Sequence, residues 1–291
     1  MTKTHGLTLV ECPRDAMQGI KTFIPTAVKI QYLTTLLRQG FDVLDCGSFV
    51  NPESIPQMAD TAEVIQAISE VETNTELLVI VANERGALRA VAYPKIKYLG
   101  FPLSVSETFQ KRNTNASREE AFRRLARIQD IAVASGKEVV AYLSMAFGNP
   151  YGDDWSAQEV AEWASKIASL GIRIISLSDT VGKANAEQLG DLFSAIHDRL
   201  PHVEVGVHLH AKPNEWLAKV EAAYNHGCRR FDAALGGFGG CPMAKDDLVG
   251  NIPSEGAFSW LSQRESAGLT MKIQWDELRL LAQETYTFGT Y

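Results

Sequence analysis

Two histidines near the end of an apolar segment are the first residues of this sequence that could do chemistry. His208 and His210 alternate with Val207 and Leu209 in a Val-rich stretch that spans 203–210. In a β-strand, side chains two residues apart lie on the same face, about 6–7 Å apart along the backbone. Both imidazoles could therefore bind one metal ion, and a pair of hydrogen-bonded histidines is the alternative.

A carboxylate could complete this set. Asp15 follows Arg14 directly after the first apolar segment, 7–12. In a closed eight-stranded barrel only the eighth strand separates the first from the seventh, so Asp15 could face the same space as the histidines. One carboxylate and two imidazoles are typical ligands of a divalent cation with open coordination positions. The alternative is that Arg14 and Asp15 form only a salt bridge at the rim.

A glycine-rich segment carries a thiol. Four of the five residues 236–240 are glycine, and Cys241 follows them. A loop of this composition could close over a site and bring the thiol in as an acid or a base. A plain flexible turn is the alternative. Asn251 lies further along the chain and offers a carbonyl oxygen as a fourth metal ligand.

Other charged residues also end predicted strands. Asp45 ends the second apolar segment and Asp179 follows the sixth. With a metal set nearby, both are predicted to support the ligands or to transfer protons. The alternatives are an ion pair for Asp45 and a helix N-cap for Asp179.

A run of basic residues is either a solvent-exposed face or a binding site for the phosphates of an acyl carrier such as coenzyme A. Its members are Lys111, Arg112, Arg118, Arg123, Arg124 and Arg127.

The elements that must position these residues follow from the apolar pattern. Apolar segments alternate with stretches of helical periodicity, which indicates repeated strand–helix units. The predicted strands are 7–12, 42–46, 77–82, 96–101, 138–143, 172–177, 203–210 and 229–234. The predicted helices are 25–39, 60–70, 84–91, 117–135, 156–169, 184–199 and 213–226. Eight such units predict a closed (β/α)8 TIM barrel of the α/β class, with its chemistry at the carboxyl ends of the strands.

The chain, 1–291, is predicted to be a single domain, with the barrel over about 7–252 and short C-terminal capping helices over about 254–291. Trp260 and Trp275 are the expected apolar anchors of these helices.

Two predicted helices begin with the residue spacing of a capping box, and a glycine follows the ends of four predicted helices. The pairs are Ser117 with Glu120 and Ser156 with Glu159, and the glycines are Gly40, Gly136, Gly171 and Gly227. An open doubly wound sheet is the rival fold, but its glycine fingerprint does not follow the first strand.

The composition restricts the class of partner. The chain has 28 Lys and Arg against 35 Asp and Glu, a net charge of −7. This balance argues against a nucleic-acid binder, which needs clustered positive charge. No apolar run is long enough for a membrane span, and no signal peptide is recognised. The four cysteines are scattered, so a disulfide framework is not expected and the cytoplasm is the predicted location.

Several stretches together resemble the 3-hydroxy-3-methylglutaryl-CoA lyases, TIM-barrel metallolyases that share an Arg-Asp motif after the first strand. The resemblance runs from residue 7 to about 260. The matching stretches are 11–18, 48–52, 56–58, 106–113, 176–182, 207–210, 237–242 and 250–251. The Gly-Gly-Cys-Pro loop and the segment 106–113 separate the lyase from the related isopropylmalate and homocitrate synthases and the oxoacid aldolases.

The resemblance implies cleavage of 3-hydroxy-3-methylglutaryl-CoA to acetoacetate and acetyl-CoA by retro-aldol (Claisen-type) chemistry. It implies an acyl-CoA substrate, a magnesium or manganese ion and a homodimer. The implied metal ligands are Asp15, His208, His210 and Asn251. Arg14 would stabilise the enolate oxygen, Cys241 would transfer a proton, and Asp45 and Asp179 match acidic positions near the metal. Gln18, Ser48 and Glu255 would contact the substrate or support the ligands.

The sequence departs from the family pattern around the acyl-binding end. Asp45 stands where the family usually has Glu, and the segments 211–214 and 245–249 differ from the usual motifs. The alternatives are therefore a related lyase or aldolase for another 3-hydroxyacyl-CoA or a hydroxy-oxoacid, and a catalytically silent metal-binding barrel. An iron oxygenase also uses two histidines and a carboxylate, but Arg14 and the cysteine loop do not argue for one.

Overall fold

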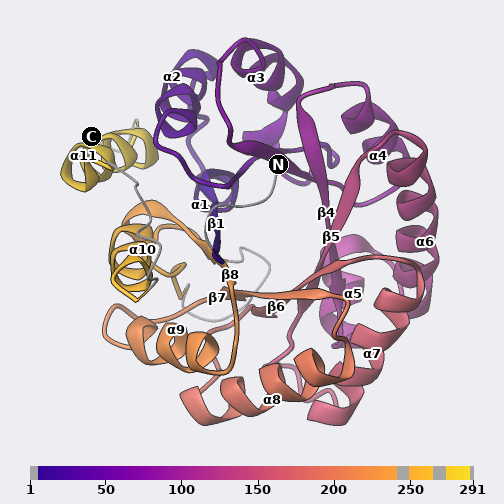
Figure 1. Ribbon diagram of the computed structural model, residues 1–291. Coiled ribbons are helices and arrows are strands. Elements are labelled where there is room, and N and C mark those ends of the chain that lie inside the picture. The colour runs from indigo at the N-terminus through magenta and orange to yellow at the C-terminus, as the bar shows by residue number, and fades with distance from the viewer. Residues whose placement is uncertain (1–5, 241–248, 265–272, 289–291) are drawn as a thin grey trace.

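The computed structural model describes residues 6–240, 249–264 and 273–288 of the chain. Eight parallel strands close into a barrel in sequence order (Figure 1). The strands are β1 Thr8–Glu11, β2 Val43–Ser48, β3 Glu76–Ile80, β4 Ile96–Ser104, β5 Glu138–Ser144, β6 Ile174–Asp179, β7 Glu204–Leu209 and β8 Arg230–Ala233. The predicted TIM barrel is confirmed, and every predicted strand is present with small differences at its ends.

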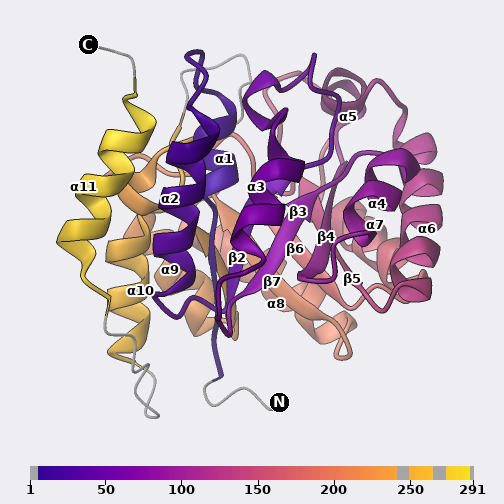
Figure 2. The same ribbon diagram turned by 90° about the horizontal axis from the view of Figure 1, so that it is seen from above.

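Helices surround the barrel and run alongside its strands (Figure 2). Those that follow the predicted pattern are α2 Thr26–Leu37, α3 Thr61–Ile68, α4 Glu84–Val91, α6 Arg118–Ala134, α7 Ala157–Ser169, α8 Ala186–Arg199 and α9 Trp216–Asn225. Two short helices at the carboxyl ends of strands were not predicted, namely α1 Pro13–Gln18 and α5 Glu107–Thr114. Both lie in segments where the sequence showed motifs but no helical periodicity. One or two turns are too short for such a periodicity to be recognised. Short 3₁₀ turns, η1 and η2, occupy Pro56–Met58 and Leu235–Gly237.

The predicted helix ends are mostly confirmed. Ser117 and Glu120 form a reciprocal capping box at the start of α6. Ser156 accepts a hydrogen bond from the Glu159 amide, but the Glu159 carboxylate pairs with Arg118 at 2.5 Å and does not complete a second box. All four predicted C-terminal glycines adopt positive φ, which residues with a side chain rarely do. They are Gly40, Gly136, Gly171 and Gly227.

The C-terminal capping helices, α10 Ser254–Ser262 and α11 Trp275–Tyr286, pack against the outside of the barrel (Figure 1). The expected anchors are confirmed, because the Trp275 ring packs against Phe41 at 6.3 Å between centroids and the Trp260 ring packs against Tyr224 at 5.7 Å. The hydroxyls of Tyr32 and Tyr286 are 2.9 Å apart and join α11 to α2. Within the described residues, no helix combines the length and the apolar character that a membrane crossing requires.

A buried carboxyl group ties the end of β1 to the segments that precede and begin α10. Glu11 is fully buried and accepts hydrogen bonds from the Leu235 amide at 2.9 Å and from the Ser254 hydroxyl. Burial raises the pKa of Glu11 from its ordinary 4.5 to about 8, and the two hydrogen bonds only partly oppose this rise. Glu11 is therefore protonated in the folded protein at neutral pH.

This proton makes stability depend on pH. Between pH 4.5 and about 8 the folded protein keeps a proton that the unfolded chain has released. The free energy of unfolding therefore falls as the pH rises through this range. We expect a Glu11→Gln variant, which is neutral at every pH, to lose less stability than the wild type over the same range. Urea denaturation across this pH range measures the difference, and equal slopes for the two proteins would contradict the assignment.

Candidate active site

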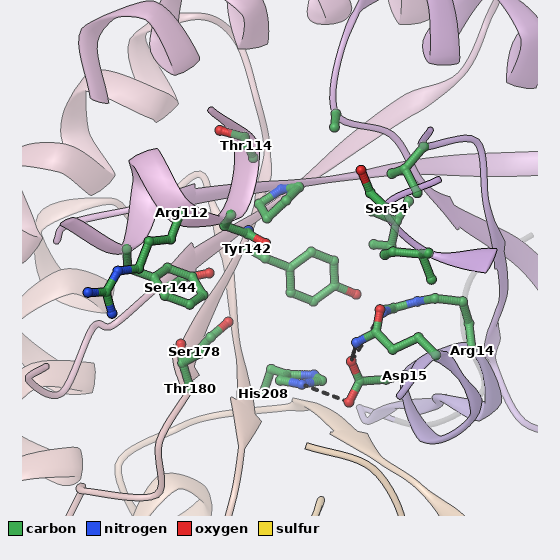
Figure 3. Close-up of a pocket in the computed structure, with 18 of the residues that line it drawn as sticks. Arg14, Asp15, Ser54, Arg112, Thr114, Tyr142, Ser144, Ser178, Thr180 and His208 are labelled. Carbon is green, nitrogen blue, oxygen red and sulfur yellow. Dashed lines mark hydrogen bonds and ion pairs between the residues drawn. The ribbon is translucent and has the colours of Figure 1, made fainter. Parts of the chain in front are cut away.

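A cavity of about 370 Å³ opens at the carboxyl ends of the strands. Figure 3 shows that residues from widely separated parts of the chain line it, with Arg14 and Asp15 on one side, Arg112 on the other and Tyr142 between them. In TIM barrels this end of the barrel carries the chemistry. The cavity therefore lies where the sequence predicts the site.

Asp15, His208 and His210 converge on one point of this cavity. Their ligand atoms lie within 4.8 Å of one another, and all three side chains are buried. The Nε2 atom of each histidine is 4.0 Å from the same carboxylate oxygen, Asp15 Oδ2. The predicted convergence of an N-terminal carboxylate with the histidine pair is therefore present in the structure. A carboxylate and two imidazoles in this arrangement can coordinate a divalent cation.

Hydrogen bonds direct both imidazoles toward Asp15. His210 Nδ1 lies 2.9 Å from the Thr180 carbonyl oxygen, and His208 Nδ1 lies 3.2 Å from Asp232 Oδ2. Because a carbonyl oxygen only accepts, His210 carries its proton on Nδ1 and has a free lone pair on Nε2. That Nε2 atom is buried and has no hydrogen-bond partner among the described residues. A cation in front of it would satisfy this atom, so the residues fit a metal.

The charge states also suit a cation. Burial raises the pKa of Asp15, but Arg14 and the two histidines outweigh burial and hold the pKa at about 2. The carboxylate is therefore ionised at neutral pH. Burial and the neighbouring His208 lower the pKa of His210 to about 4, so this imidazole is neutral and free to bind. Metal ligation requires these two forms.

Asn251 lies beside this set. A bridge pairs it with His210, and its Nδ2 atom donates to Asp15 Oδ2 at 2.8 Å and to the Phe238 carbonyl oxygen at 2.8 Å. Two acceptors around the same nitrogen fix the orientation of the amide. The structure therefore brings Asn251 next to Asp15 and the two histidines. Its side chain donates a hydrogen bond to Asp15 here, whereas the sequence predicted that its carbonyl oxygen would bind the cation.

Arg14 is fixed by a buried carboxylate from the next strand. Its guanidinium donates to Asp45 from Nη2 at 2.6 Å and from Nε at 3.0 Å, and its Nη1 donates to Asp15 at 3.1 Å and to Gln18 at 2.8 Å. Gln18 in turn donates to Asp15 at 2.7 Å. Burial raises the pKa of Asp45 to about 6, although Arg14 acts against this rise. Arg14, Gln18 and Asp45 thus form one rigid group beside Asp15, His208 and His210.

Five of the predicted site residues in the described chain do not line the cavity. Two of them, Asp45 and Asn251, contact the lining residues Arg14 and Asp15, and the other three are Asp179, Ser48 and Glu255. The Asp179 carboxylate binds Lys219 Nζ at 2.7 Å and accepts from the Lys183 amide at 2.8 Å. It points away from the cavity because strand neighbours alternate, and Ser178 takes the inward position. The Ser48 hydroxyl donates to the Ile80 carbonyl oxygen, and Glu255 accepts from the Gly236 amide at 3.0 Å and pairs with Arg279. In these places the three side chains hold loops and turns together.

Cys241 lies outside the described residues, so its predicted role remains a prediction. The chain leading to it does approach the site. Gly239 has a φ of +100°, and a Cβ there would lie 2.6 Å from Asn251 Nδ2 and 3.1 Å from the Asp15 carbonyl oxygen. Only glycine fits so close to Asn251 and Asp15.

Comparison with known proteins agrees with this geometry. The family model described as HMGL-like matches residues 9–283. The chain belongs to the HMGL-like family. Mouse mitochondrial hydroxymethylglutaryl-CoA lyase is 36% identical over 243 residues, which are 84% of this chain and 74% of the relative. Rat cytoplasmic 3-hydroxy-3-methylglutaryl-CoA lyase is 34% identical over 84% of this chain and 70% of its own.

Solved structures place the chain in the same group. An HMG-CoA lyase from Acinetobacter baumannii, in complex with coenzyme A and 3-methylmalate, superposes with a TM-score of 0.86 at 32% identity, covering 98% of this chain and 92% of its own. An HMG-CoA lyase from Brucella melitensis gives 0.87 at 28% identity over 98% and 99%. The carboxyl transferase domain of Rhizobium etli pyruvate carboxylase shares only the fold, with a TM-score of 0.71 at 15% identity over 98% and 47%.

Residues of this HMGL-like site that the sequence pattern did not single out lie on β5, β6 and β8 or directly after β6. Tyr142 packs edge-on against His208 with 5.8 Å between ring centroids, and its buried hydroxyl has no hydrogen-bond partner among the described residues. Ser144, Ser178 and Thr180 also line the cavity, and Asp232 lies behind His208. The signal that could have found them is the alternation of inward and outward positions along β5, β6 and β8.

The residues of the basic run at 111–127 were predicted to form either a solvent-exposed face or a phosphate-binding site, and the structure contains examples of both positions. Arg112 lines the cavity of this HMGL-like barrel, and its guanidinium lies over the Tyr151 ring at 4.5 Å. Arg118 and Arg127 instead pair with Glu159 and Glu84, each at 2.5 Å, on the helices outside. Only Arg112 is therefore placed to meet a ligand in the cavity.

Proposed function

We propose that this protein is a metal-dependent carbon–carbon lyase that cleaves 3-hydroxy-3-methylglutaryl-CoA to acetoacetate and acetyl-CoA. The observation that carries the proposal is the convergence of Asp15, His208 and His210 beside the fixed guanidinium of Arg14 in one cavity. The hydroxymethylglutaryl-CoA lyases among the relatives support the substrate and the reaction class. A related lyase or aldolase for another substrate is the less favoured alternative.

The cofactor proposed for this site is a divalent cation, magnesium or manganese. Asp15, His208 and His210 would hold it, and Asn251 lies beside them as a further ligand or as a donor to Asp15. When bound, the cation supplies Lewis-acid polarisation of the oxygens that the substrate presents to it. The ionised Asp15 and the neutral His210 are already in the protonation states that this binding needs.

Arg14 is proposed to stabilise the charge that bond cleavage creates. The C3 hydroxyl gives its proton to a base and its oxygen becomes the ketone of acetoacetate as the bond between C2 and C3 breaks. The electron pair of that bond stays on the acetyl-CoA fragment, as an enolate whose charge lies on the thioester oxygen. Asp45 and Gln18 hold the Arg14 guanidinium by hydrogen bonds of 2.6–3.2 Å. A donor fixed before the reaction stabilises such charge without reorganisation.

A proton must reach the enolate carbon to complete acetyl-CoA, and we propose Cys241 as its donor. We expect Cys241→Ala to lower the turnover number by about 10²-fold, the scale of a lost general acid. The matched control is Cys228→Ala, since this buried thiol does not line the cavity. Stopped assays under reducing conditions measure both variants. Full activity of the Cys241 variant would remove the thiol from the mechanism.

The remaining partners are also proposals. Arg112, at the edge of the cavity, is placed to bind a phosphate of coenzyme A. The A. baumannii structural relative holds coenzyme A, which supports this assignment. The homodimer and the cytoplasmic location predicted from the sequence stay predictions.

The test of the function is product formation by the purified protein. With magnesium or manganese present, we expect equal amounts of acetoacetate and acetyl-CoA from 3-hydroxy-3-methylglutaryl-CoA, and no product once a chelator is added. A parallel panel of other 3-hydroxyacyl-CoA thioesters and hydroxy-oxoacids identifies the alternative substrates. Turnover of a panel member but not of 3-hydroxy-3-methylglutaryl-CoA would overturn the substrate. Metal binding without any turnover would favour a silent barrel.

A further inference from the structure

The two histidines of the metal set are held by acceptors of different charge. His210 Nδ1 faces a neutral backbone carbonyl, that of Thr180, at 2.9 Å. His208 Nδ1 faces the Asp232 carboxylate at 3.2 Å. In both rings the atom left for a cation is Nε2, at 4.0 Å from Asp15 Oδ2. Of the two rings, only that of His208 has its Nδ1 atom bonded to another side chain.

The barrel places Asp232 directly beside His208. The two residues are register partners on the neighbouring strands β7 and β8, and Asp232 is only 3% exposed. Its second carboxylate oxygen, Oδ1, is buried and has no hydrogen-bond partner among the described residues. The Asp232 carboxylate therefore makes a single hydrogen bond to a described side chain, and that bond is to His208.

A buried arginine, Arg230, lies next to Asp232 inside the barrel. Arg230 stands two residues earlier on the same face of β8 and is 1% exposed. Gly206 on β7 leaves room for it, since a Cβ there would lie 2.8–3.0 Å from the Arg230 side chain. Burial lowers the pKa of Arg230, but Asp232 and Glu204 outweigh burial, so its pKa is raised. Arg230 thus remains charged and lies next to the Asp232 carboxyl group inside the barrel.

We propose that Asp232 is a positioning residue for the metal site, which holds the His208 ring with its proton on Nδ1 so that Nε2 faces the cation. The inference rests on the metal centre of the proposed function and adds a residue to it. A carboxylate behind a ligating imidazole fixes the tautomer and makes the ligand more basic. Asp232 acts on the cation only through His208.

The first experiment measures metal affinity without substrate. Manganese is titrated into the metal-free protein and followed by calorimetry, for the wild type and for Asp232→Asn and Asp232→Ala. We expect the dissociation constant to rise by about 10- to 100-fold in the alanine variant, the usual scale for the loss of such a partner. The asparagine variant keeps an acceptor without the charge, so a smaller rise is expected, and it remains informative if the alanine variant does not fold.

The matched control is Ser176→Ala. Ser176 is a buried polar residue on an inward position of β6, and its hydroxyl has no partner in the described structure. It touches neither histidine by any recorded hydrogen bond, so its removal is expected to leave the manganese affinity within about twofold of the wild type. An equal loss of affinity in this control would mean that any disturbance of the barrel interior weakens the site, and would overturn the assignment.

The second experiment observes the tautomer itself in the absence of metal. Long-range ¹H–¹⁵N spectra at alkaline pH report which imidazole nitrogen carries the proton, and a His208→Asn variant assigns the signal. We expect His208 to carry its proton on Nδ1 in the wild type and to populate the Nε2–H tautomer in Asp232→Ala. An unchanged tautomer together with unchanged manganese affinity would overturn the proposal.

These outcomes separate the two proposals. If the wild-type protein binds no manganese, the metal centre of the proposed function fails, while the tautomer spectrum still tests the contact between Asp232 and His208. If the wild type binds manganese and cleaves the thioester but both Asp232 variants bind equally well, only the positioning role fails.

Discussion

Replacement of Arg14 by methionine is expected to lower the turnover number for 3-hydroxy-3-methylglutaryl-CoA by about 10³-fold. Methionine has a similar length but carries no charge and donates no hydrogen bond. Arg14 is the residue proposed to meet the developing enolate, and it is held by Asp45 at 2.6 Å and lines the cavity beside Asp15. Steady-state assays at saturating metal measure the loss. The Michaelis constant is expected to change less than the turnover number, because the guanidinium acts mainly on charge that appears in the transition state.

The Arg14→Met variant also leaves a carboxylate without its cation, so stability must be separated from catalysis. Asp45 is 1% exposed, and removal of the partner of a buried ion pair typically costs about 3–5 kcal/mol. The double variant Arg14→Met/Asp45→Asn removes both charges and is expected to recover most of this stability. It is not expected to recover turnover. Recovery of turnover would show that the loss came from misfolding and would remove Arg14 from the mechanism.

Loss of the carboxylate at Asp15 is expected to abolish metal-dependent cleavage. In Asp15→Asn the shared anionic ligand disappears from a set whose two Nε2 atoms lie 4.0 Å from the same oxygen. The Lewis-acid contribution of a bound cation is several kcal/mol, so turnover is expected to fall by at least about 10³-fold. Manganese titration and product assays are run on the same preparation, and binding with wild-type affinity would contradict the ligand assignment.

Asp179→Asn is the matched control for this variant. Asp179 is another buried carboxylate at the end of a strand, but it binds Lys219 at 2.7 Å and does not line the cavity. Its replacement is expected to lower thermal stability while manganese affinity stays close to that of the wild type. Loss of manganese binding in Asp179→Asn would mean that the cavity does not define the metal site.

Most of the fold could be predicted from the sequence because local patterns report it. Apolar segments and helical periodicity gave all eight strands, and positive φ at Gly40 and Gly136 follows from their places after helices. The short helices α1 and α5 were missed because one or two turns leave no periodic signal. Asp15, His208 and His210 could be predicted because each stands at a strand end, where strand order and alternation decide which residues meet.

The sequence could not predict which way a side chain points from its strand or which partner it meets. Asp45 and Asp179 look equivalent in the sequence, since both are single carboxylates at strand ends. In the structure Asp45 binds Arg14 and Asp179 binds Lys219 on the other side of its strand. Asp232 stands in an ordinary strand sequence, and only its register with His208 gives it a partner.

The amino-acid sequence by itself determined that this chain forms a (β/α)8 barrel and that one carboxylate and two imidazoles stand at strand ends, because hydrophobic periodicity and residue type are local properties. Tertiary structure alone decided which charged side chain pairs with which, where Tyr142 projects, and that Asp232 lies behind His208. Hydrogen bonds and ion pairs act over about 3 Å, and closure of the barrel sets distances on that scale between residues remote in the chain.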